Sequence, residues 1–234
     1  MAQYSEFRQQ IADTARDLTR KGFLSGTGGN LSLRIPGENA FAITPSNFDY
    51  LKMAAEDICV LDMQLTPLAG SRKPSIESGM HAAIYRVRPD VNAIIHTHQV
   101  YPSTLALINE PIPALFDEQV QSLGRSVEII PYAPSGSMEL VEMVSGRIND
   151  YANAFIMANH GALLLGSDME RAVNNVAVLE KCALAYLFAL CTEKEIRRIP
   201  PYAREFAFDR LQKDLQKYAA HEQAGRIGKT DLHE

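Results

Sequence analysis

Two short apolar segments joined by a tight turn constrain the fold more than any other feature of this sequence. Leu31, Leu33 and Ile35 alternate with polar residues, which is the period of a strand with one buried face. The Pro-Gly-Glu-Asn sequence at 36–39 predicts a turn, and Phe41 to Thr44 predicts the returning strand. The segment is typical of an antiparallel hairpin.

Other short apolar runs predict strands at 58–62, 93–96, 127–132, 154–157 and 162–165. Apolar residues at helical spacing predict helices at about 5–22, 76–87 and 138–148. Ser167 and Glu170 have the spacing of a capping box and predict the start of a long helix. Because helices and strands do not alternate strictly, we expect a mainly antiparallel sheet with helices on both faces.

The chain has 234 residues, and 46% of them are hydrophobic, which is enough for one large core. We expect a single domain over 1–234, with 200–234 forming a C-terminal helical tail. The formal net charge is −5, so nucleic acid is not an expected partner. The longest wholly apolar run is 183–190, too short to span a bilayer, and we expect a cytoplasmic protein without membrane contact.

A pair of histidines, His96 and His98, lies at the end of the predicted strand at 93–96. Residues i and i+2 of a strand point to the same face, so both imidazoles can converge on one point. Neutral imidazole binds zinc, manganese or cobalt, and three protein ligands leave coordination positions open for a substrate. Two exposed or hydrogen-bonded histidines are the alternative interpretation.

A third histidine, His160, lies between the predicted strands at 154–157 and 162–165. A strand end would deliver this side chain to a cleft, and Gly161 would let the backbone approach closely. A single structural histidine is again the alternative. His81 lies four residues after Glu77 on one predicted helix, and we interpret it as structural or as supporting the site.

Glu77 begins the predicted helix at 76–87. A carboxylate near a divalent cation can act as a ligand and, once displaced by substrate, as a general base. An acidic residue placed favourably at a helix N-terminus is the alternative. The glycine-rich sequence at 26–30 offers backbone N–H groups and an amide, which suit a phosphate or carboxylate. It is not a nucleotide-binding fingerprint, because no helix is predicted after it.

Five motifs in this order resemble the class II aldolase/adducin family. They are GTGGNLSLR (26–34), ITPS (43–46), KPSIE (73–77), HTH (96–98) and NHG (159–161). The resemblance runs from about Gly22 to Leu190. It implies a three-layer α/β/α fold around a mainly antiparallel sheet, and a homotetramer with active sites at subunit interfaces.

The resemblance also implies roles for individual residues. His96, His98 and His160 match the ligands of one divalent metal per subunit, which we expect to be zinc, with manganese or cobalt as alternatives. Glu77 matches the catalytic acid/base and is expected to contact the metal as well. The matching anion-binding positions are Gly29, Asn30, Ser46, Asn47, Ser75 and Ile76. Two of these differ from the family's aldolase, which has serine in place of Ile76 and glycine in place of Asn47, and isoleucine cannot donate a hydrogen bond to phosphate.

These matches imply a metal-dependent carbon–carbon lyase. We expect an aldolase-like reaction on a small hydroxycarbonyl compound or sugar phosphate, through a metal-stabilised enediolate. A decarboxylase of a β-keto or aromatic hydroxy acid is the second hypothesis. A sugar-phosphate epimerase and a non-catalytic, adducin-like interaction module are further alternatives. The presence of all three histidines and Glu77 favours an enzyme.

Overall fold

The centre of the molecule is an eight-stranded sheet with the strand order β4-β3-β2-β1-β5-β8-β7-β6. The computed structural model describes residues 4–148 and 150–230. Its strands are β1 (Asn30–Arg34), β2 (Ala40–Ile43), β3 (Cys59–Asp62), β4 (Pro67–Ala69), β5 (Ala93–Thr97), β6 (Glu128–Ile130), β7 (Ala154–Met157) and β8 (Gly161–Gly166). All neighbouring strands pair antiparallel except β6 and β7, which pair parallel. The prediction of a mainly antiparallel sheet is confirmed.

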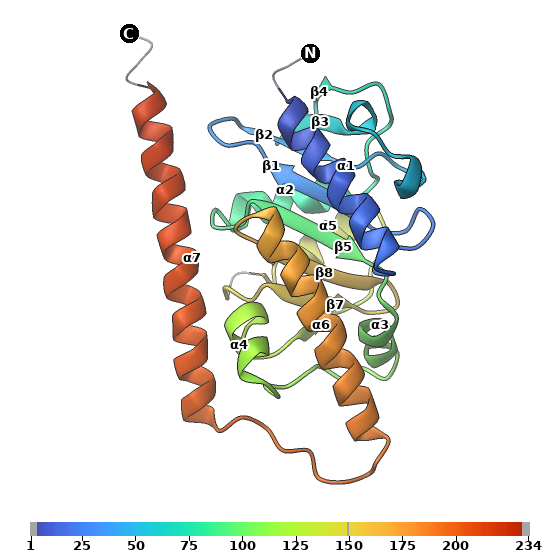
Figure 1. Cartoon of the computed structure of the whole chain (residues 1–234), viewed down its shortest axis with the longest axis vertical. Coiled ribbons are helices and arrows are strands. Elements are labelled where there is room, and N and C mark those ends of the chain that lie inside the picture. The colour runs from blue at the N-terminus through green and yellow to red at the C-terminus, as the bar shows by residue number, and fades with distance from the viewer. Residues whose placement is uncertain (1–3, 149, 231–234) are drawn as a thin grey trace.

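Helices cover both faces of this sheet (Figure 1). They are α1 (Ser5–Arg20), α2 (Ser78–Val87), α3 (Val100–Leu107), α4 (Asp117–Leu123), α5 (Met138–Ser145), α6 (Met169–Leu190) and α7 (Pro201–Thr230), with short 3₁₀ turns η1 (Tyr50–Lys52) and η2 (Ala55–Asp57). Side chains of α1, α3 and α6 pack into one hydrophobic cluster, and those of α2 and α5 pack into another. The expected three-layer arrangement is therefore confirmed.

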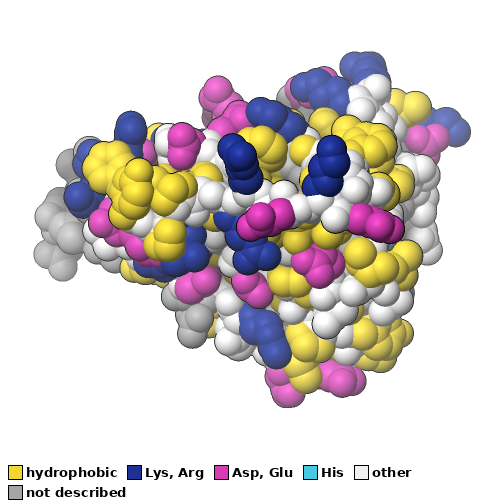
Figure 2. Space-filling view, turned by 90° about the horizontal axis from the view of Figure 1, so that it is seen from below, with side chains coloured by type: hydrophobic (Ala, Val, Ile, Leu, Met, Phe, Trp, Pro, Cys, Tyr) yellow, Lys and Arg dark blue, Asp and Glu magenta, His cyan; other side chains and the backbone are white. Residues whose placement is uncertain are grey.

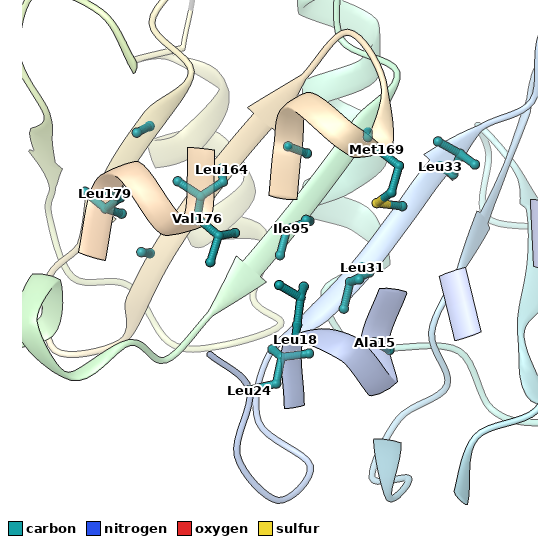
Figure 3. Close-up of a cluster of buried hydrophobic side chains, with 14 of the residues drawn as sticks. Ala15, Leu18, Leu24, Leu31, Leu33, Ile95, Leu164, Met169, Val176 and Leu179 are labelled. Carbon is teal, nitrogen blue, oxygen red and sulfur yellow. The ribbon is translucent and has the colours of Figure 1, made fainter. Parts of the chain in front are cut away.

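The central strands supply both hydrophobic layers by alternation. In β5, Ile95 packs with the layer beneath α1 and α6, whereas Ile94 packs with the layer beneath α2 and α5. Leu164 and Leu165 divide in the same way in β8. Figure 3 shows the first layer, where side chains of α1, β1, β5, β8 and α6 meet between helices and sheet. Burial on both faces fixes the register of these strands, because a shift by one residue would exchange the two layers.

The long helix α6 begins one residue later than predicted, so the prediction of Ser167 as its N-cap was wrong. Asp168, not Ser167, precedes the helix, and its carboxylate accepts a hydrogen bond from the backbone N–H of Arg171 at 2.8 Å. By length and composition α6 could cross a membrane. Its buried residues include Met169, Ala172, Val176, Leu179 and Ala183, spaced three or four apart on a single stripe that packs on the sheet.

The predicted tail at 200–234 is helical from Pro201 to Thr230, and 231–234 lie outside the described residues. Phe208, Leu211 and Leu215 of α7 pack against Val120 of α4, a helix that the sequence interpretation did not predict. Figure 2 shows the end of the molecule near the α6–α7 connection, where acidic and basic side chains are interspersed with hydrophobic ones. This end therefore does not present a field of a single sign.

A buried arginine ties the helix that follows Glu77 to the segment that leads into β7. The Arg88 guanidinium donates to the Asp90 carboxylate and to the backbone carbonyls of Ile148 and Ala152. The side chains of Arg88 and Asp90 are only 3% and 4% exposed. This contact fixes the position of α2 relative to the strand before His160.

Replacing Arg88 by alanine should destabilise the protein by about 3–5 kcal/mol, because it leaves the Asp90 carboxylate buried without its cation. Urea denaturation followed by circular dichroism measures the change. The exposed Lys181–Glu118 pair provides a control, and Lys181→Ala should unfold at nearly the wild-type urea concentration. Equal midpoints for Arg88→Ala and the wild-type protein would show that this contact does not stabilise the fold.

Candidate metal centre

The fully buried His96 lies in the middle of the sheet. On β5 it is paired with Asn30 of β1 on one side and Leu163 of β8 on the other. Its Nδ1 lies 2.9 Å from the carbonyl oxygen of Ala162, which can only accept a hydrogen bond. Nδ1 therefore carries the proton, and the neutral ring keeps its Nε2 lone pair for another partner.

Two further imidazoles meet His96 at this end of β5. His98 lies one residue beyond the strand, and His160 lies in the turn between β7 and β8. The ring of His96 is 4.9 Å from that of His98 and 4.7 Å from that of His160, measured between centroids. One ligand nitrogen from each of the three rings lies within 4.8 Å of the other two. The structure thus brings together the histidines at 96, 98 and 160.

Glycines make this close approach possible. A Cβ atom on Gly161 would lie 2.3 Å from the carbonyl oxygen of Thr97 and 2.8 Å from the His98 ring. A Cβ atom on Gly28 would lie 2.8 Å from His98 Nδ1, and one on Gly29 would lie 2.5 Å from the carbonyl oxygen of His96. The glycine-rich loop and the turn after β7 therefore pack directly against the histidine strand.

The carboxylate of Glu77 lies against two of these histidines. Glu77 immediately precedes α2, and its side chain is 3% exposed. Its Oε1 is 3.1 Å from His160 Nε2, and its Oε2 is 3.4 Å from His96 Nε2. Oε2 also accepts a hydrogen bond from Asn30 Nδ2 at 2.7 Å, and Oε1 accepts one from the Ser135 hydroxyl at 2.6 Å.

These surroundings set the charge states of the site. Burial lowers the pKa of His96 to about 4 and also lowers the pKa of His98, so both rings are neutral near pH 7. Burial of Glu77 opposes its ionisation, but the contacts with His160 and His96 and the hydrogen bonds from Ser135 and Asn30 outweigh it. The pKa of Glu77 is therefore held below its usual range.

The donor set fits a divalent cation. Three imidazoles and one carboxylate are ligands that zinc and similar metals accept, and neutral imidazole is the form that binds. The buried, ionised carboxylate of Glu77 would also be stabilised by the positive charge of a bound cation. His160 Nδ1 is buried and has no hydrogen-bond partner among the described protein atoms. The cluster is therefore not a completed protein hydrogen-bond network.

A cavity of about 140 Å³ opens beside the histidines. Its lining includes the residues expected to bind an anion, Gly29, Asn30, Ser46, Asn47 and Ser75, together with Thr27, Gly28, Pro45, Ile76, Glu77, His98, Ser135 and His160. The hydroxyls and the glycine-rich backbone can donate to an anion, but no lysine or arginine is among these lining residues. An anion here would be held by neutral donors.

The two departures from the aldolase pattern differ in kind. Asn47 has φ 51°, a left-handed backbone that asparagine tolerates better than most residues, so it can take the conformation that glycine would adopt. Ile76 is 55% exposed in the cavity wall, and its side chain lies near Gly136. The change at 76 therefore alters the chemistry of the wall, whereas the change at 47 is compatible with the same turn.

Two contacts of the site have no signal in the local sequence. Ser135, which bonds Glu77, lies in a Pro-Ser-Gly-Ser loop whose composition predicts only a turn. The hydroxyl of Tyr50 donates to the carbonyl oxygen of Gly29 at 2.6 Å and so holds the glycine-rich loop from outside the cavity. In neither case does a local pattern indicate the partner.

Known proteins with similar sequences carry out related reactions. A 5-deoxy-D-ribulose 1-phosphate aldolase of Bacillus thuringiensis is 31% identical over 76% of this chain and 83% of its own length. A 3-oxo-tetronate 4-phosphate decarboxylase of Haemophilus influenzae is 32% identical over 75% of this chain and 84% of its own length.

The fold points to the same group of proteins. The solved structure of an L-fuculose 1-phosphate aldolase superposes with a TM-score of 0.84 and 32% identity, covering 89% of this chain and 97% of that one. Residues 9–187 match the sequence profile described as Class II Aldolase and Adducin N-terminal domain. This chain therefore belongs to the class II aldolase and adducin family.

Proposed function

We propose that the histidine cluster is the catalytic metal centre of an enzyme that cleaves a carbon–carbon bond in a small sugar phosphate. The chain is a lyase, since its named relatives, aldolases and a decarboxylase, share that class of reaction. The observation that supports the proposal is the meeting of three imidazoles, two of which lie against one buried carboxylate. That group is suited to a divalent cation and to a proton transfer beside it.

In this proposal His96, His98 and His160 hold one divalent metal per subunit, and Glu77 completes the ligand set until substrate displaces it. A bound cation would stabilise the negative charge that develops on the enediolate oxygens of the reacting substrate. Glu77 is ionised before substrate binds and can take a proton through its carboxylate oxygens. Asn30 and Ser135 hold those oxygens, so the carboxylate is oriented before reaction.

The cavity beside the metal centre would hold the rest of the substrate. Ser46, Ser75 and the backbone of the glycine-rich loop provide neutral donors, which suit a phosphate group. Gly29, Asn30 and Asn47 complete the expected anion site. We further propose zinc as the metal, a homotetramer as the assembly and the cytoplasm as the compartment; manganese and cobalt would satisfy the same ligands.

Aldol cleavage is our first choice of reaction, and decarboxylation is the second. The decarboxylase relative and the apolar Ile76 in the cavity wall support the second. Both reactions leave negative charge next to a carbonyl, so the same centre serves either. The retained metal ligands and acid/base favour these lyases over an epimerase or a non-catalytic interaction module.

Substituting His96 by alanine should reduce metal binding from about one equivalent per chain to well below one. The substitution removes an imidazole whose tautomer is fixed, with the Nε2 lone pair free to bind metal. Elemental analysis after dialysis against zinc, manganese or cobalt measures the stoichiometry. Glu139→Ala, which changes an exposed acid on α5, should bind metal as the wild-type protein does. Full occupancy in folded His96→Ala would remove this residue from the ligand set.

Substituting Glu77 by glutamine should leave bound metal in place and lower kcat by roughly 10²- to 10⁴-fold, because the amide cannot take up the proton. The assay follows aldehyde or CO₂ release from a panel of sugar phosphates and oxo acids. Glu139→Gln is the matched control. Wild-type turnover in Glu77→Gln would rule out the acid/base role, and an inactive wild-type protein with metal bound would contradict the lyase proposal.

Substituting Ile76 by serine should lower KM for a phosphorylated substrate by roughly 5- to 10-fold, since one added hydrogen bond contributes about 1 kcal/mol. KM for the unphosphorylated analogue should stay nearly constant. Ile76→Ala separates loss of bulk from gain of a donor. An equal response of both substrates to Ile76→Ser would show that residue 76 does not face the phosphate.

A further inference from the structure

A chain of buried polar side chains leads from Glu77 into the layer between β1 and α2. Asn30 and Ser32 belong to β1, and His81 and Tyr85 belong to α2. His81 and Ser32 are completely buried, and Tyr85 and Asn30 are 2% and 4% exposed. Polar groups buried to this extent need hydrogen-bond partners, and here the partners form one continuous series.

The series begins at the Asn30 amide, whose orientation is fixed by its neighbours. An ionised carboxylate only accepts hydrogen bonds, so the Asn30 group 2.7 Å from Glu77 Oε2 is the NH₂ group. The amide oxygen of Asn30 then faces His81 Nε2 at 2.6 Å. An oxygen acceptor requires a proton on that nitrogen, so His81 carries its proton on Nε2.

The other side of the imidazole agrees with this tautomer. His81 is neutral near pH 7, because burial lowers its pKa to about 3. Its Nδ1 therefore accepts, and the Ser32 hydroxyl at 2.6 Å donates to it. Ser32 Oγ in turn lies 2.7 Å from the hydroxyl of Tyr85 and can accept from it. Each hydrogen bond in the series then donates in the direction of Glu77, and the neutral imidazole ring connects an accepting Nδ1 to a donating Nε2.

We propose that His81 is a positioning residue for Glu77: its Nε2–H group holds the Asn30 amide so that the NH₂ group faces the carboxylate. The proposal rests on the proposed catalytic role of Glu77. Without a donor at Nε2, the Asn30 oxygen loses its partner, and only the Glu77 carboxylate still distinguishes the two orientations of the amide. Rotation of the amide by half a turn would place an oxygen lone pair against the carboxylate, and Glu77 would lose a donor that orients it.

The tautomer is tested directly by ¹⁵N NMR of the metal-loaded, ¹⁵N-labelled protein. Correlations between the carbon-bound ring protons of His81 and its two ring nitrogens should show a protonated Nε2 and an unprotonated Nδ1. The His81→Gln variant identifies these signals by their absence. A His81 ring protonated on Nδ1 would overturn the proposal, because the amide oxygen of Asn30 would then face a lone pair. This readout does not depend on any catalytic activity.

Kinetic measurements on matched variants test whether the Nε2–H donor of His81 affects catalysis. His81→Phe keeps a flat ring but removes the donor, and it should lower kcat by roughly 10- to 100-fold with metal content unchanged. His81→Gln places an amide NH₂ near the position of Nε2 and should recover most of the lost kcat. Equal losses in the two variants would indicate a packing role and overturn the proposal.

A double-mutant cycle with Asn30→Ala provides the decisive comparison. If His81 acts through the Asn30 amide, His81→Phe should have almost no additional effect on kcat in the Asn30→Ala background. Fully additive losses would contradict the proposal. If His81→Phe does not fold, the His81→Gln cycle with Asn30→Ala takes its place.

The Glu77→Gln assay separates this proposal from the proposed function. Wild-type turnover in Glu77→Gln would refute the acid/base role, while the NMR tautomer would still decide whether the hydrogen-bond series exists as described.

Discussion

The buried carboxylate of Glu77 imposes a charge requirement on the surrounding site. The carboxylate is 3% exposed and lies against His96 and His160. Hydrogen bonds from Asn30 and Ser135 orient it, but neutral donors do not neutralise it. Burying an isolated ion is costly, so a partner of positive charge is needed nearby. A divalent cation held by the nitrogens of His96, His98 and His160 would supply that charge.

The antiparallel sheet brings the components of this site together from distant parts of the chain. β5 carries His96 between β1, which begins with Asn30, and β8, which follows His160. The hydrophobic layers on both faces fix the register of these strands, so the histidines reach the same end of the sheet. Glu77 lies at the start of α2. This helix packs on the face of the sheet opposite to that covered by α1 and α6. The packing of the hydrophobic core therefore also fixes the positions of the site residues.

Several parts of this arrangement follow from the sequence alone. The spacing of His96 and His98 after an apolar run predicts convergence, and the glycine after His160 predicts a close backbone approach. Both features are observed. The hairpin and the family motifs together predict the layered fold, because each motif indicates the same architecture.

Other parts depend on tertiary contacts that no local pattern encodes. Ser135 reaches Glu77 across 58 residues, and its loop sequence indicates only a turn. The parallel pairing of β6 with β7 depends on where the intervening segment crosses, and α4 is short and becomes stable by packing on α7. The predicted N-cap of α6 was wrong by one residue. Ser167 and Asp168 are both good capping residues, and only the backbone geometry distinguishes them.

The proposed metal centre consists of one divalent cation shared by three imidazoles beside Glu77. Diffraction data from crystals of the metal-loaded protein, collected on both sides of the metal absorption edge, locate this cation in the anomalous difference map. We expect one peak per chain, about 2 Å from a ring nitrogen of each of His96, His98 and His160. A fully loaded protein whose anomalous peak lies away from these rings would contradict it.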